Sequence, residues 1–107
     1  MAKVILTSSA RCKYGEMMDY AYANFGEKTE KDLQIAFNKL VLQLSSFPQS
    51  ASKERLLSGF TEQYRSIVFR KLWRIVYVYD SVSEEVLIVD IWDNRSNPDA
   101  LWKKFKE

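Results

Sequence analysis

Two stretches decide the fold: WRIVYVY at residues 73–79 and VLIVDIW at residues 86–92. In the first, aromatic and β-branched residues alternate with a period of two, which predicts a strand with two distinct faces. One face carries Trp73, Ile75, Tyr77 and Tyr79, and the other carries Arg74, Val76 and Val78. The second stretch is almost continuously apolar, as is typical of a strand buried on both faces in the middle of a sheet.

A further strand precedes these two. Apolar residues alternate again from Tyr64 to Phe69, and residues 70–72 form the turn into the next strand. The polar residues 80–85 make the following connection. Beyond the third strand, residues 94–98 break the pattern, and residues 99–105 predict a short C-terminal helix.

The first half of the chain predicts helices. Residues 4–6 form a short strand, and apolar positions then recur with helical spacing from Ala10 to Phe25. Gly26 supplies the left-handed position that ends this helix. A sequence resembling a capping box begins at Thr29, and a second helical pattern continues until Pro48 forbids it. The stretch from Gln49 to Gly59 is expected to form a loop or a partial helical turn.

This order predicts an α+β fold in a single domain spanning residues 1–107. Its parts are an N-terminal strand, an antiparallel two-helix hairpin, a three-stranded antiparallel meander and a short C-terminal helix. The hairpin must cover one face of the sheet to bury its apolar stripe. We expect the other face to be left for partners.

Composition limits the classes of function. The chain has 107 residues, a net charge of +2, one cysteine and no histidine. Cys12 cannot form an internal disulfide, and a zinc cluster cannot be built, so we expect no metal or other cofactor and a reducing compartment. The apolar run at residues 4–6 is too short for a signal-peptide core, and no stretch could span a membrane. We therefore expect a soluble cytoplasmic protein with no membrane partner.

The sequence contains no phosphate-binding glycine loop, nucleophile elbow or Cys/His pair, which disfavours conventional hydrolases and nucleotide-binding proteins. Two carboxylate pairs occur, Glu84/Glu85 and Asp90/Asp93, and the first of them falls in a turn. A solvated turn is a poor place for catalytic carboxylates.

Cationic residues are the more informative set. They are Arg65, Arg70, Lys71 and Arg74 on the first meander hairpin, and Arg95 just beyond the third strand. An antiparallel meander could gather them on one concave surface, where arginine would suit phosphate or carboxylate. The alternative is that each is solvated or pairs with a nearby carboxylate.

Two positions in the meander carry more specific expectations. Arg74 lies within an apolar run, where an unpaired charge would be costly, so a defined partner is expected for it. Trp92 is either a core residue, which its buried strand favours, or a stacking platform next to Arg95.

Three segments in order resemble the RelE/ParE toxin superfamily. They are Gln63-Tyr64-Arg65, Leu72-Trp73-Arg74-Ile75-Val76-Tyr77 and Val86-Leu87-Ile88-Val89-Asp90-Ile91-Trp92-Asp93-Asn94-Arg95. The family pattern is an aromatic residue before a basic one, then an aromatic-Arg-aliphatic-aliphatic-Tyr strand, then an apolar strand that ends in arginine. The upstream strand and helix hairpin match as well, so the resemblance covers essentially the whole chain.

The resemblance implies the toxin of a type II toxin–antitoxin pair, a class that includes plasmid stabilization systems. A cognate antitoxin would wrap the toxin, and operator DNA would be contacted only through the antitoxin. Two mechanisms are known on this fold: inhibition of DNA gyrase in ParE-like members, and ribosome-dependent mRNA cleavage in RelE-like members.

The resemblance implies that Arg65, Arg74 and Arg95 occupy the family's basic positions, and in an mRNA interferase they would be the catalytic residues. Arg70 and Trp92 complete the expected target-binding set. However, Ile67 stands where the RelE-like pattern has a lysine, and no Tyr or His follows Arg95 before the predicted terminal helix. Without these groups an enzyme lacks its usual acid and base. We therefore expect a ParE-like, non-enzymatic toxin, with an mRNA interferase or a degenerate, non-toxic antitoxin-binding protein as the alternatives.

Overall fold

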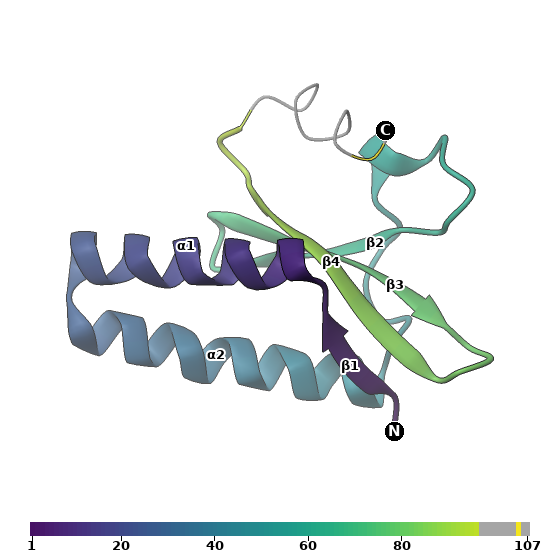
Figure 1. Ribbon diagram of the computed structural model, residues 1–107, viewed down its shortest axis with the longest axis horizontal. Helices are drawn as coiled ribbons and strands as arrows, with labels where there is room; N and C mark the ends of the chain where they lie inside the picture. The colour runs from purple at the N-terminus through teal and green to yellow at the C-terminus, as the bar shows by residue number, and fades with distance from the viewer. Residues whose placement is uncertain (97–104, 106–107) are drawn as a thin grey trace.

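The computed structural model describes residues 1–96 and residue 105, and it has the predicted α+β architecture (Figure 1). Its elements are β1 (Lys3–Leu6), α1 (Ser8–Phe25), α2 (Glu27–Ser46), the 3-10 turn η1 (Arg55–Leu57), β2 (Arg65–Phe69), β3 (Trp73–Asp80) and β4 (Glu85–Asp93). The helix predicted at residues 99–105 lies outside the described residues, apart from Phe105. None of the helices described is both long and apolar enough to span a membrane.

The two helices are joined by Gly26 alone. This residue has a φ of 90°, so it ends α1 and begins α2 without an intervening loop. The prediction that a capping box on Thr29 begins α2 is wrong, because the N-cap of α2 is Gly26, three residues earlier. Glu27 and Glu30 instead lie in the first turn of α2, where carboxylates interact favourably with the helix dipole.

The sheet has four strands in the order β1-β4-β3-β2. The three C-terminal strands form the predicted antiparallel meander, and β4 is central, as its apolar sequence indicates. β1 pairs in parallel with β4, from Lys3 opposite Glu85 to Leu6 opposite Ile88. The helical hairpin follows β1, leads through η1 to β2, and lies along one face of the sheet (Figure 1).

Strand β4 contains a bulge at Val89. Val76 pairs with Asp90 and Tyr77 pairs with Ile88, so Val89 has no partner of its own in this ladder. Thr7 holds the bulge, because its N–H donates to the Ile88 carbonyl at 3.0 Å and its hydroxyl donates to the Val89 carbonyl at 3.1 Å. A bulge shifts the side-chain alternation by one residue, so the residues that follow point to opposite faces from those a regular strand would give.

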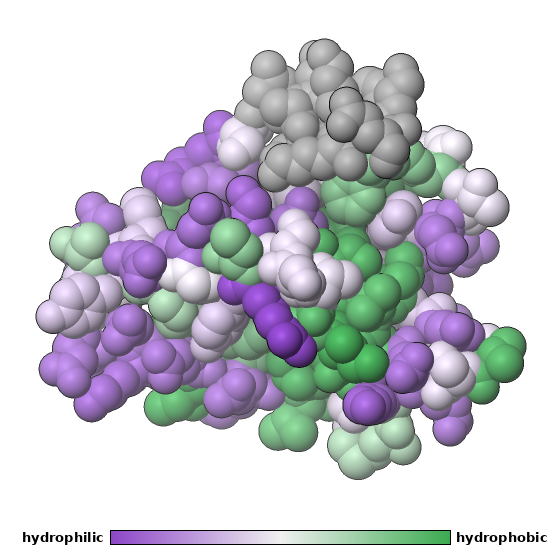
Figure 2. All heavy atoms as spheres, viewed as in Figure 1, coloured by the Kyte–Doolittle hydropathy of each residue, from purple (hydrophilic) through white to green (hydrophobic). Residues whose placement is uncertain are grey.

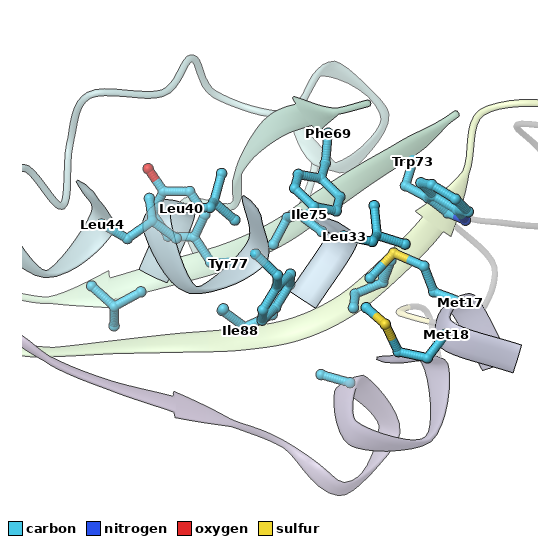
Figure 3. Packing of buried hydrophobic residues seen from close by; sticks show 14 of the residues in the cluster. Met17, Met18, Leu33, Leu40, Leu44, Phe69, Trp73, Ile75, Tyr77 and Ile88 are labelled. Atoms are coloured by element: carbon cyan, nitrogen blue, oxygen red, sulfur yellow. The ribbon is translucent and has the colours of Figure 1, made fainter. Parts of the chain in front are cut away.

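The main core lies between the hairpin and the sheet. Met17 and Met18 of α1, Leu33 and Leu44 of α2 and Ile75 of the sheet belong to one cluster, and all five are buried (Figure 3). The aromatic side chains Tyr77, Phe69 and Trp73 extend this core along the meander. The sequence-based grouping of Trp73, Ile75 and Tyr77 on one face is therefore confirmed, and that face is the one turned to the helices.

A second, smaller cluster lies on the opposite face of the sheet. Val76 and Trp92 pack there against Leu57, and Phe60 and Tyr64 from the preceding segment add to it. The expectation that this whole face is left for partners is therefore wrong, since the chain covers part of it with its own residues. An open groove of about 630 Å³ remains beside the cluster. Its apolar wall consists of Ile5, Tyr64, Val78, Tyr79, Leu87 and Val89, and Figure 2 shows hydrophobic residues gathered over the central strands.

The one-residue link between the helices can be tested with a pair of glycine substitutions. Gly26→Ala places a side chain at a φ of 90°, and we expect it to lower the free energy of unfolding by about 1–3 kcal/mol. Gly15 lies exposed within α1, and a Cβ added there would meet no atom within 4 Å. Gly15→Ala should therefore raise the free energy of unfolding by about 0.5–1 kcal/mol. Urea unfolding followed by circular dichroism measures both; equal effects would contradict the assigned backbone.

Candidate functional site

Arg95 is fixed by the carboxylate of Asp93 at the end of β4. Its Nε donates to Oδ1 at 3.0 Å and its Nη2 donates to Oδ2 at 2.8 Å, a bidentate ion pair. The backbone N–H of Arg95 also donates to Oδ1 of Asp93 at 2.8 Å, so one carboxylate shapes the turn and orients the guanidinium. The Arg95 side chain remains 54% exposed.

Helix α1 supplies the second contact of Arg95. The guanidinium carbon lies 5.2 Å from the centre of the Tyr20 ring, and Nη1 lies 3.4 Å from the Tyr20 hydroxyl. Tyr20 is itself held edge-on against Trp73, with ring centres 6.0 Å apart. These side chains line a pocket of about 160 Å³, to which Lys13 and Glu16 also contribute.

The electrostatics of the pair follow from this geometry. The side-chain hydrogen bonds from Arg95 hold the pKa of the Asp93 carboxyl below its ordinary value, although partial burial opposes the shift. The same bonds raise the pKa of the Arg95 guanidinium, which is charged in any case. The pair is therefore ionised over the whole physiological range.

Arg74 has the defined partner that its apolar surroundings predict, namely Glu54. Its Nη1 lies 2.8 Å and 3.0 Å from the two carboxylate oxygens, and the Glu54 side chain is only 3% exposed. Ser66 donates a hydrogen bond from its hydroxyl to the same carboxylate, and the N–H of Leu56 donates at 3.3 Å. Sequence reasoning missed Glu54, because it lies in a polar, weakly patterned segment.

Arg65 lies at the far end of the meander. It pairs across the sheet with Tyr77, and its Nη1 donates to the carbonyl of Ala51 at 2.7 Å. The Tyr77 hydroxyl is buried nearby, and burial raises its pKa, while the Ala51 backbone and the Arg65 charge oppose this. Arg65 thus fastens the segment before η1 to the sheet.

Arg70 and Lys71 form the tip of the β2–β3 hairpin, and Arg70 is exposed. Both have positive φ values, 52° and 64°, which side-chain-bearing residues rarely adopt. Asn94 supports this turn, because its N–H donates to the Leu72 carbonyl at 2.8 Å and its side chain donates to the Lys71 carbonyl at 3.0 Å. The turn and the end of β4 are therefore one connected unit.

Trp92 is a core residue. It is 1% exposed, and its indole N–H donates to Asp90 at 3.0 Å. Its ring meets Phe105 edge-on, with centres 5.8 Å apart. Of the carboxylate pairs, Asp90 is buried beside Trp92 and Asp93 binds Arg95, whereas Glu84 and Glu85 lie at the β3–β4 turn.

The structure does not gather the arginines on one surface. Arg74 projects from the face that carries Trp92, whereas Arg65 and Arg95 lie on the face of the helices. Arg65 and Arg95 are further separated by the length of β3 between Tyr77 and Trp73, about 13 Å at the usual rise of a strand. Across residues 1–96 and 105, no group of three His, Cys, Asp or Glu side chains could hold a metal ion.

This strand order, with a helical hairpin between the first strand and an antiparallel meander, is the fold of the RelE/ParE toxins. A structure described as the chromosomal ParDE TA system from P. aeruginosa matches with a TM-score of 0.68 and 15% identity, over 87% of this chain and 96% of that chain. No protein-family model matches the chain, and no curated protein matches it in sequence.

Two structures from E. coli share the same fold. The intact RelBE toxin-antitoxin complex matches with a TM-score of 0.58 and 13% identity, over 90% of this chain and 100% of that chain. The isolated RelE toxin matches with a TM-score of 0.57 and 15% identity, over 100% of both chains. The expected fold is thereby confirmed.

The Asp93–Arg95 pair predicts a pH-dependent stability. The pKa of Asp93 is lower in the folded than in the unfolded state, so the pair stabilises the fold fully at pH values above the unfolded-state pKa. This stabilisation is lost as the pH falls through the folded-state pKa. We expect Asp93→Asn to lower the melting temperature near neutral pH and to approach the wild type at acid pH, once the Asp93 carboxyl is protonated in the folded state. Asp32→Asn removes an exposed carboxylate on α2 as the control; a pH-independent difference would contradict the prediction.

The buried Glu54–Arg74 pair predicts a large cost on removal of one partner. Arg74→Met leaves the Glu54 carboxylate buried without its cation, and we expect a loss of about 2–3 kcal/mol in the free energy of unfolding. The double variant Glu54→Met/Arg74→Met should recover most of it, because no charge is then left unpaired. Urea titration of the single and double variants checks this, and a double variant as unstable as the single would be inconsistent with it.

Proposed function

We propose that this chain is the toxin of a type II toxin–antitoxin system. The observation that carries the proposal is the fold shared with toxins of the ParDE and RelBE systems across nearly the whole chain. The sequence resemblance at residues 63–65, 72–77 and 86–95 supports it independently of the backbone. In the last of these segments, Arg95 follows the end of β4 by two residues.

A ParE-like action on DNA gyrase is the favoured mechanism. RNA cleavage needs convergent cations and an acid–base pair, yet Arg65, Arg74 and Arg95 point to different places. Arg74 is further bound to Glu54, so its charge is already compensated. The chain contains no histidine, and Ile67 stands at the position of the lysine in RelE-like members. The TM-score is also higher for the ParDE structure than for the two E. coli structures.

A cognate antitoxin is the proposed partner, and contact with operator DNA would be made through it. The open groove on the helix-free face offers apolar surface to such a partner at Ile5, Val78, Leu87 and Val89. A stable interface buries at least roughly 1,200 Å² in total, so the antitoxin must extend well beyond this groove.

The RelE-like mRNA interferase is the second candidate. What favours it is that Arg95 is exposed at a pocket and rigidly oriented, as a residue stabilising a phosphate would be. A degenerate member that binds an antitoxin without toxicity is the third, and growth assays separate it from both toxins.

Induced expression with and without the adjacent small reading frame tests the proposal. We expect growth arrest that the neighbouring gene relieves, inhibition of gyrase supercoiling by the purified chain, and no new codon-specific cuts in mRNA on translating ribosomes. Arg95→Ala should abolish the arrest, while Arg11→Ala, an exposed arginine on α1, should leave it unchanged.

Each alternative has its own result. Codon-specific cuts without gyrase inhibition would establish the interferase. No arrest at expression levels confirmed by immunoblot would favour the degenerate member. If the Arg95→Ala variant still arrested growth fully, Arg95 would not belong to the site, whether the target is gyrase or the ribosome.

A further inference from the structure

Among the residues that the structure describes, the guanidinium of Arg95 has one edge occupied by a carboxylate and one edge without an acidic partner. Nε and one N–H of Nη2 donate to the two oxygens of Asp93. On the other edge, Nη1 has only the Tyr20 hydroxyl, at the long distance of 3.4 Å, among the described residues. Since a guanidinium carries five N–H donors in a fixed plane, the edge formed by Nη1 and Nη2 can bind a second bidentate anion.

Both contacts of Arg95 restrict where this edge can point. The bidentate pair fixes the plane of the guanidinium, because two parallel hydrogen bonds to one carboxylate allow little rotation. The Tyr20 ring lies 5.2 Å from the guanidinium carbon, within the range of a cation–π contact. Tyr20 cannot swing away freely, because Trp73 and Phe25 contact its ring edge-on at 6.0 Å and 6.2 Å between ring centres.

We propose that Asp93 and Tyr20 are positioning residues for Arg95. They present its Nη1–Nη2 edge, at the pocket between α1 and the end of β4, to a phosphate or carboxylate group of the target. The identity of that target rests on the proposed function. Lys13, on the same pocket, adds a second cation, which is balanced by Glu16 at 3.6 Å. The pocket of about 160 Å³ has room for an anionic group such as a phosphate or carboxylate.

Positioning and simple charge attraction predict opposite results for Asp93. Replacing Asp93 with asparagine removes a negative charge beside Arg95, so attraction alone would strengthen anion binding. If Asp93 orients the guanidinium, the same substitution weakens binding, because the free edge is no longer held toward the pocket. The sign of the change therefore separates the two explanations.

Nitrogen-15 NMR of the arginine Nε–Hε groups tests this without any toxin assay. Inorganic phosphate is titrated into the full chain, and Arg95→Lys identifies the Arg95 signal. We expect a saturable shift in the wild type and about tenfold weaker binding in Asp93→Asn, the order of one charge-assisted hydrogen bond. The Arg95 Hε proton should also exchange faster with solvent in that variant. Asp80→Asn removes the same charge at the opposite end of β3 and should leave both readouts unchanged.

Tyr20 is tested by a graded pair. Tyr20→Phe keeps the ring and loses only a long hydrogen bond, so it should bind phosphate nearly as the wild type does. Tyr20→Leu loses the ring and should weaken binding about threefold, the order of an exposed cation–π contact. Melting temperatures of both variants verify that they fold.

Several results would overturn the positioning roles. They are wild-type affinity or tighter binding in Asp93→Asn, an equal loss in Asp80→Asn, and no saturable phosphate shift in the wild type. Growth assays on the same variants report on the proposed function separately. If the wild type causes no arrest but the NMR results hold, the anion site stands and the toxin function fails; in the reverse case, the toxin stands and this site fails.

Discussion

Thr7 joins the first strand and the first helix to the bulge of β4, and the use of both faces of the sheet depends on that bulge. It directly follows β1, accepts the hydrogen bond from the Ala10 N–H that caps α1, and donates to the carbonyls of Ile88 and Val89 in β4. By holding the bulge at Val89, it reverses the alternation of the rest of β4. Without the bulge, Asp93 would leave the face of the helices, and the contact between Arg95 and Tyr20 could not form.

The bulge also creates the two unequal cores. Val86 and Ile88 before it and Ile91 after it face the helices, whereas Val89 and Trp92 face the smaller cluster. The second core is small, yet it anchors the segment around η1 through Leu57, and this segment carries the Glu54 partner of Arg74. A local backbone irregularity therefore determines how both faces of the sheet are used.

Local sequence patterns predicted the elements well, but not their long-range pairing. The alternation at residues 73–79 and the helical spacing of α1 and α2 involve neighbours in sequence, so the strand faces and the hairpin could be inferred. The bulge at Val89, the partner of Arg74 and the ring beneath Arg95 could not, because each joins residues far apart in the chain: Thr7 with Val89, Glu54 with Arg74, and Tyr20 with Arg95. Burial of Trp92 followed from its apolar strand, whereas the dispersion of the arginines depended on strand register.

Two of the arginines, Arg74 and Arg95, have their charge balanced by a carboxylate, and this bears on the kind of target that the proposed site can recognise. Electrostatic binding to nucleic acid depends on many unpaired cations, which displace counterions from the phosphates. This chain has a net charge of +2, and its Arg74 and Arg95 are each paired to a carboxylate, so it has little capacity for such binding. An arginine held by a carboxylate gains direction while losing net charge. It discriminates by geometry, so it suits a single well-placed anionic group within a shaped protein interface. The pairing of these arginines therefore supports the proposal of a protein target.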